Sequence, residues 1–131
     1  MTITFNRFVL LLAALLPSLA AGAPSPQHGN ALTEYVAAGK SLHAVLDSVK
    51  DVDTATAAKD SLFAAVVRYN AAKASLRNLK FEENNPEHQN LIQAATQDMA
   101  TISLQVNNDV QRIRTLPQVQ KLLASTLKQL M

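Results

Sequence analysis

Residues 58–79 read AKDSLFAAVVRYNAAKASLRNL, a stretch in which apolar and small side chains recur every three or four residues. The stripe consists of Ala58, Leu62, Ala65, Tyr69, Ala72, Leu76 and Leu79. This spacing lasts for about three heptads and places the whole stripe on one face of an α-helix. Phe63, Val66 and Val67 lie off the stripe, so we expect this helix to touch two neighbours and to be central.

Similar stripes on either side predict further helices. The first is expected from about Ala31 to Lys50, with Leu32, Tyr35, Gly39, Leu42, Leu46 and Val49 on one face. A third helix carries Ile92, Ala95, Met99, Ile102 and Val106, and a short last one carries Val119, Leu122, Leu123, Thr126, Leu127 and Leu130. The expected fold is all-α, an up-and-down helical bundle of three long helices plus a short C-terminal helix over residues 31–131.

Helix boundaries are marked by capping residues. Asp51 to Thr54 offers side-chain oxygens for the start of the second helix, and Asn85, followed by Pro86 and Glu87, is a specific start for the third. The third helix should end near Thr115, because Pro117 has no amide hydrogen to donate.

Charges agree with these boundaries. Acidic residues open the second helix and the basic residues Lys73, Arg77 and Lys80 close it, while Glu82, Glu83 and Glu87 lie at the start of the third. An antiparallel pairing of these two helices is therefore expected to bring the basic end beside the acidic start. In the basic set that also includes Arg68, we expect a solvated face, and contact with acidic lipid or glycan is the alternative.

The first 23 residues have the pattern of a cleavable secretory signal peptide. Arg7 supplies the positive charge, Phe8 to Leu16 form an uninterrupted apolar run, and small residues follow. Cleavage is expected after Ala20, Gly22 or Ala23. The apolar run is shorter than the roughly 20 residues that span a bilayer, which argues against an uncleaved anchor. Residues 24–30, with two prolines and a glycine, are expected to be a linker.

Composition narrows the classes of function. The chain has 131 residues, no cysteine, and 12 basic against 10 acidic side chains. Such a balance argues against nucleic acid as a partner. The absence of cysteine excludes disulfides, thiolate metal sites and a lipoprotein anchor. The expected location is therefore the periplasm or the extracellular space.

Catalytic and ligand-binding groups are few. His28, His43 and His88 are far apart in sequence, and no two of them have the three- or four-residue spacing of a zinc-binding helix. Haem bound between Met99 and His43 is a remote alternative, because a methionine on an apolar stripe is usually core. The acidic pairs Asp51 with Asp53 and Glu82 with Glu83 lie at helix ends, where capping explains them. No serine has a nucleophile elbow. We therefore expect no catalytic, cofactor or metal residues, and no enzyme.

Two stretches resemble a layout that recurs in small exported, Ala- and Leu-rich, all-helical bacterial proteins of uncharacterised function. They are residues 49–58, VKDVDTATAA, and residues 113–119, IRTLPQV. The resemblance implies an exported bacterial helical bundle and no particular activity.

The leading expectation is a non-enzymatic protein that binds another envelope or extracellular protein. Two alternatives remain open: a small-molecule or haem carrier, and a secreted membrane- or host-directed factor. Membrane contact is the less favoured mode. A homodimer formed in the manner of a coiled coil, through the Gly39 stripe and the Ala-rich second helix, is a further expectation. The last helix is expected to seal the apolar groove left by the other three.

Overall fold

The computed structural model describes residues 26–130, and these residues form four α-helices. They are α2 (Pro26–Ser48), α3 (Val52–Asn78), α4 (Pro86–Arg114) and α5 (Pro117–Lys128). No strand occurs in this part of the chain, so the prediction of an all-α helical bundle is confirmed. The predicted signal peptide, residues 1–23, lies outside the described residues.

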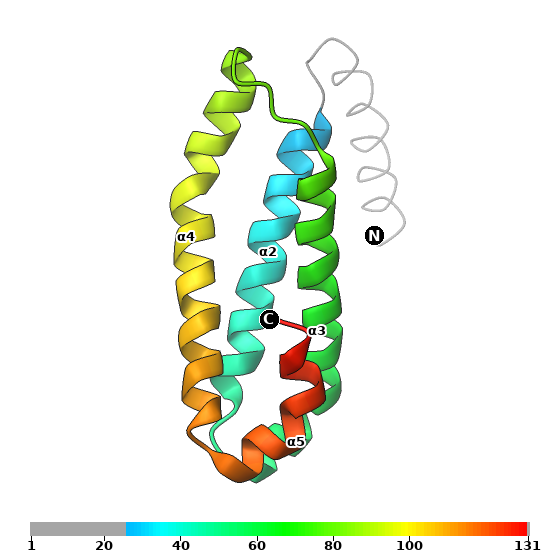
Figure 1. Ribbon diagram of the computed structural model, residues 1–131, viewed down its shortest axis with the longest axis vertical. Coiled ribbons are helices and arrows are strands. Elements are labelled where there is room, and N and C mark those ends of the chain that lie inside the picture. The colour runs from blue at the N-terminus through cyan, green and yellow to red at the C-terminus, as the bar shows by residue number, and fades with distance from the viewer. Residues whose placement is uncertain (1–25, 131) are drawn as a thin grey trace, which may run out of the picture.

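Helix α2 is the central helix. It packs along both α3 and α4, whereas α5 folds back over one end of the bundle and contacts α3 and α4 (Figure 1). The prediction that residues 58–79 form the central helix was wrong, although α3 does touch two neighbours, α2 and α5. Helix α3 therefore packs along α2. The charge pattern had instead suggested that it packs along α4.

Two flanks of α2 explain its position. Tyr35 of α2 lies against Tyr69 of α3, and on the other flank Gly39 lies against Ile102 of α4. Because Gly39 has no side chain, the two helices approach closely at this level. Gly39 is therefore buried in the contact between α2 and α4 of one chain and is not exposed for contact with a second chain.

The core is aliphatic, as the composition indicated. Its largest fully buried side chains include Leu42 and Leu46 of α2, Leu62 of α3, Ile113 of α4 and Leu123 of α5. Each such side chain contributes on the order of 1.5–3 kcal/mol through its removal from water. Because these side chains come from all four helices, α5 belongs to the same core and seals the bundle as expected.

The predicted starts of α3 and α4 are confirmed in detail. The Asp51 carboxylate accepts a hydrogen bond from the Thr54 amide at 2.8 Å, and the Thr54 hydroxyl oxygen accepts one from the Asp51 amide at 3.0 Å. The carboxylate also accepts a hydrogen bond from the Thr54 hydroxyl at 2.8 Å, and the bonds from the Thr54 backbone N–H first and from its hydroxyl second hold the pKa of Asp51 below its ordinary value. At the next start, the Asn85 side chain accepts from the amides of Glu87 and His88.

The start of α2 differs from its prediction. Residues 26–30 are helical, although residues 24–30 were expected to be a linker. Proline is tolerated in the first turn of a helix, so Pro26 does not prevent this start. Contacts with distant residues add to it: His28 packs against Phe81 and His88, and Gly29 lies opposite Leu91. These contacts are invisible in the local sequence.

The opposite end of α2 is held by Arg112 of α4. Its guanidinium donates to the carbonyl oxygens of Val49 at 2.6 Å and Leu46 at 2.9 Å. These carbonyls belong to the last turn of α2 and to the connection that follows it, where helical partners are lacking. Arg112 thus fixes the turn between α2 and α3. Within residues 26–130 no helix combines the length and apolar character needed to cross a bilayer.

Candidate interaction surface on helix α3

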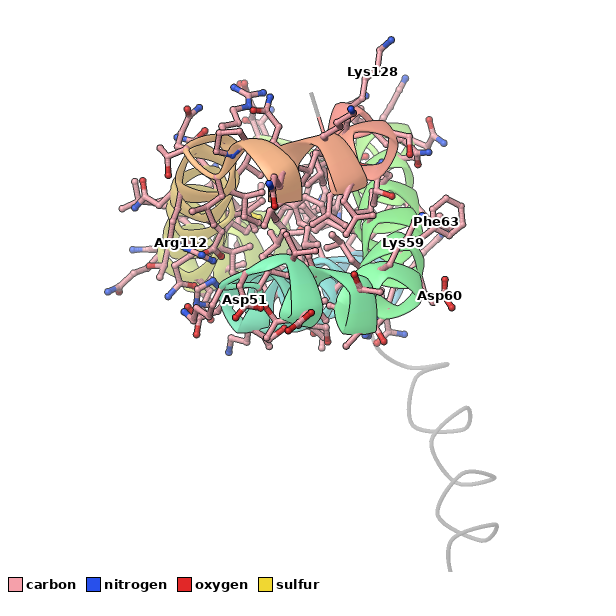
Figure 2. The ribbon with its side chains drawn as sticks, turned by 90° about the horizontal axis from the view of Figure 1, so that it is seen from below. Asp51, Lys59, Asp60, Phe63, Arg112 and Lys128 are labelled. Atoms are coloured by element: carbon pink, nitrogen blue, oxygen red, sulfur yellow. The ribbon has the colours of Figure 1, made fainter. Side chains whose placement is uncertain are left out.

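The outer face of α3 carries a second row of residues at helical spacing, turned away from the core. We define the α3 outer face as Val52, Thr56, Asp60, Phe63, Val67, Ala71, Ala74 and Asn78, all of them exposed. Phe63 is 50% and Val67 is 47% exposed. Phe63 projects from α3 away from the rest of the bundle, near Lys59 and Asp60 (Figure 2).

The exposure of Phe63 follows from its position on the helix. The neighbouring Leu62 and Val66 are fully buried, so the two sides of α3 that face α2 and α5 are already occupied. Phe63 and Val67 are one helical turn apart and point to the third side. Of the three off-stripe residues from which two neighbours were predicted for this helix, Val66 is buried, whereas Phe63 and Val67 are exposed.

Two large apolar side chains on adjacent turns differ from the scattered apolar residues of an ordinary surface. The side chain of phenylalanine has a large apolar surface, and its removal from water is favourable. Two exposed alanines of the same row, Ala71 and Ala74, extend the apolar strip toward the end of α3. Their side chains are too small to shield Phe63 or Val67 from water. The row is bordered by opposite charges, with Asp53 near the start of the helix and Arg77 near its end.

Helix α4 provides a comparison. Its exposed large apolar residues are Ile92, 37% exposed, and Leu104, 61% exposed. They are separated by about 18 Å along the helix axis, as the rise per residue requires. Each is therefore a single apolar side chain, and neither forms a strip with the other.

The histidines form contacts that their sequence spacing did not predict. His28 of α2 and His88 of α4 stack with ring centroids 4.2 Å apart, and Phe81 packs edge-on against both. His28 Nε2 bonds to the Lys80 carbonyl oxygen at 2.7 Å, and His88 Nδ1 accepts from the Glu82 amide at 2.9 Å. Both rings thus hold the connection between α3 and α4 onto the start of α2.

His43 has a different partner, Asp109 of α4. Its Nδ1 lies 2.5 Å from the Asp109 carboxylate, and the side chains are 30% and 9% exposed. A carboxylate-held imidazole also occurs in catalytic triads, where it must activate a nucleophile. The nearby serines of α2 have other hydrogen bonds: Ser41 accepts from Arg68, and Ser48 donates to the Val45 carbonyl. The pair therefore acts as a polar link between α2 and α4.

Tyr35 and Tyr69 form a second buried polar link, between α2 and α3. Their hydroxyl oxygens are 3.0 Å apart. Burial, together with the hydrogen bond to Tyr35, raises the pKa of Tyr69. Tyr69 also lines a surface pocket of about 390 Å³ with Lys73, Ser103 and Leu130. The lining of the pocket is partly polar, and it also includes the core residues Val106 and Val110.

The basic set on α3 does not form one solvated face. Arg68 is paired with Glu34 of α2, with Nε 2.7 Å from the carboxylate oxygen, and the Lys73 ammonium lies 5.0 Å from the centre of the Tyr69 ring. The hydrogen bond from Arg68 lowers the pKa of Glu34, and the same contact raises the pKa of Arg68. Arg68 and Lys73 thus point to opposite flanks of the helix.

The geometry argues against haem held by Met99 and His43. His43 lies beside Asp109, which is ten residues beyond Met99 on α4 and therefore about 15 Å farther along its axis. Two ligands of one iron cannot be that far apart. Met99 packs against the core instead. Among residues 26–130, no cluster of three or more His, Cys, Asp or Glu side chains is arranged to hold a metal ion.

No protein-family model, curated protein or solved structure shows significant similarity to this chain.

Proposed function

We propose that the protein is an exported, non-enzymatic helical bundle that binds a protein of the periplasm or the extracellular space through the α3 outer face. The observation that carries the proposal is the pair Phe63 and Val67, about half exposed on adjacent turns of a rigid helix. We further propose that the whole mature chain is an up-and-down bundle of three long helices and a short closing one.

Physical chemistry favours a protein partner for this surface. Aromatic residues that fill a pocket on a partner supply much of the affinity of protein interfaces, while charged residues around them set orientation. Phe63 is suited to the first role, and Lys59 and Asp60 to the second (Figure 2). Because α3 is fixed on two sides by α2 and α5, little ordering entropy is lost when the surface is covered.

Export is supported by the sequence of residues 1–23, which has the charged start, apolar run and small residues of a secretory signal. The cysteine-free composition accords with a free product without a lipid anchor. Its fold depends on packing instead of disulfides.

The proposal is tested with two matched substitutions, Phe63→Gln on α3 and Leu104→Gln on α4. Both replace an exposed apolar side chain at mid-helix, so both should change the free energy of unfolding by less than about 1 kcal/mol. Each variant is expressed with its own N-terminal segment and crosslinked in intact cells and culture medium. We expect Phe63→Gln to lose its crosslinked protein partner and Leu104→Gln to keep it. Equal crosslinking of both variants would contradict the proposal.

A further inference from the structure

The connection between α3 and α4, residues 79–85, lies beside the start of α2 at one end of the bundle (Figure 1). We propose that His28 and His88 form an acid-sensitive latch, which holds this connection onto α2 only while both imidazole rings are neutral. Uptake of a second proton by either ring releases the connection. This inference concerns the end of the bundle and does not depend on the α3 outer face.

The hydrogen bond of His88 fixes where its proton lies. A backbone amide can only donate, so His88 Nδ1, which is 2.9 Å from the Glu82 amide nitrogen, accepts and carries no proton. The one proton of the neutral ring is therefore on Nε2. A proton added at Nδ1 would point at the amide hydrogen, so the bond to Glu82 cannot survive it. Because His88 is only 8% exposed, water has little access to replace the lost partner.

His28 has the same tautomer for the opposite reason. A carbonyl oxygen can only accept, so His28 Nε2, which is 2.7 Å from the Lys80 carbonyl oxygen, carries the proton. Its Nδ1 is buried and has no hydrogen-bond partner. A proton added at this nitrogen would be a charged donor without an acceptor, which is unfavourable away from water.

Packing joins the two rings into one unit. Their centroids are 4.2 Å apart, and the Phe81 ring lies edge-on at 4.8 Å from His28 and 5.7 Å from His88. The two hydrogen bonds reach Lys80 and Glu82, the residues on either side of Phe81. Release of either bond therefore also disturbs the packing on which the other depends. Two charged rings at this separation would in addition repel each other.

The other charged groups around the latch are exposed. They are Arg77 at the end of α3, Lys80, Glu82 and Glu83 in the connection, and Glu87 in the first turn of α4. The first eight residues of α2, 26–33, carry no acidic or basic side chain other than His28. Within residues 26–130 no ion pair joins either latch ring to an acidic side chain. Exposed charges of both signs are screened by water and salt, so the hydrogen bonds of the rings dominate.

The direction of the pH effect follows from proton binding. In the released form both imidazoles reach water, so each can hold two protons, whereas in the closed form neither has a place for the second. The stability of the closed form is therefore fully present above the range in which histidine titrates, about pH 5 to 8, and falls as the pH drops through it. His43 differs, because its partner is the carboxylate of Asp109, which suits a charged ring.

Amide exchange with deuterated water, followed by NMR, tests the latch. The full chain is expressed with its own N-terminal segment, and each exchange rate is divided by the intrinsic rate at the same pH. Between pH 7.5 and pH 5.0 we expect the protection of the Glu82 amide, which donates to His88, to fall at least tenfold. Amides of residues 104–126 should change by less than about threefold. An unchanged Glu82 amide, or an equal loss in both regions, would overturn the inference.

The matched variant combines His28→Gln with His88→Asn. The glutamine amide group can donate to the Lys80 carbonyl from the place of Nε2, and the asparagine oxygen can accept from the Glu82 amide at the place of Nδ1. Neither side chain takes up a proton, so this variant should keep its Glu82 protection at pH 5.0. His43→Gln is the control and should respond to pH as the wild type does. A double variant that still loses protection would assign the effect to the carboxylates and refute the latch.

The wild-type rings give a test that needs no substitution. The nitrogen-15 shifts of His28 and His88 should show Nε2 protonated and Nδ1 bare at pH 7.5. On acidification, the signal of a charged ring should appear in parallel with the loss of Glu82 protection. A charged His28 or His88 in a chain whose Glu82 amide stays protected would show that the closed form accepts the proton, and the inference would fail even if the variants did not fold.

Discussion

Gly39 is the residue at which the packing of α2 on α4 is tightest. A Cβ atom at this position would overlap the Cγ2 methyl of Ile102, which is itself buried. Because Ile102 is β-branched, its side chain has few alternative rotamers in a helix. The sequence indicated that Gly39 lies on a contact face, but it did not show that the contact is with α4 of the same chain.

We predict that Gly39→Ala lowers the free energy of unfolding by about 1 kcal/mol. The overpacking cost of typically 1–3 kcal/mol exceeds the gain of up to about 1 kcal/mol in helix propensity. Gly29→Ala is the matched control, because its Cβ would meet Leu91 at an ordinary 3.6 Å. It should leave stability unchanged or raise it. Urea denaturation of both variants tests this, and a Gly39→Ala protein more stable than Gly29→Ala would show that α4 yields easily.

The contact partners of the histidines could not be predicted from the sequence. His28 and His88 are 60 positions apart, and His43 and Asp109 are 66 apart, so no spacing rule joins them. Their contacts exist only because α2 runs beside α4. The burial of Asp109 was likewise not indicated by any local sequence pattern.

At the scale of the elements, helix starts could be predicted because capping is local. Asp51 with Thr54, and Asn85 with the amides of Glu87 and His88, involve residues at most three positions apart. The start of α2 was missed for the opposite reason. Its first turn, with His28, is held by Phe81 and His88, which are far away in sequence.

We predict that Asp51→Ala makes the protein less stable at neutral pH and less sensitive to acid. The Thr54 hydrogen bonds keep the pKa of Asp51 below its ordinary value of about 3.9, so the folded state binds this proton less readily than the unfolded state. The stabilisation is present above pH 4 and is lost as the pH falls through the lower, folded-state pKa. Asp51→Ala has no such contribution to lose.

Urea midpoints at pH 7 and pH 2.5 measure this effect. The difference between the wild type and Asp51→Ala should be large at pH 7 and should shrink at pH 2.5. Asp53→Ala removes a carboxylate from the same turn without removing the cap, so it should cost less at pH 7. A difference that is equal at both pH values would mean that the Asp51 carboxylate does not stabilise the helix start.

At the scale of the molecule, periodicity predicted that the elements of residues 26–130 are helices, but it did not predict how these helices are arranged. The stripe of α3 is the clearest in the sequence, yet α2 is central because it offers two close-packing flanks, one with Tyr35 and one with Gly39. Periodicity reports how regular a face is, and not how closely a helix packs against its neighbours. The α3 outer face was likewise visible as off-stripe Phe63 and Val67, but its exposure was not.

We predict that Leu123→Ala destabilises the whole bundle, because α5 closes the core between α3 and α4. Leu123 is fully buried, and removal of such a side chain costs about 2–5 kcal/mol. Leu122, its half-buried neighbour on the same helix, is the control, and Leu122→Ala should cost less. Denaturation followed by circular dichroism gives both values. Local fraying of α5 without a shift of the main transition would contradict the central place of α5 in the core.

The short reach of α5 has a consequence for motion. Its 12 residues cover less than half the length of the 29-residue α4, and they do so at one end of the bundle (Figure 1). Beyond that cover, α4 from Pro86 to Thr101 buries only His88, and α3 buries nothing after Ala72. Amide protons there should exchange with deuterated water sooner than those beneath α5. The bundle should therefore open from the end that holds His28 and His88.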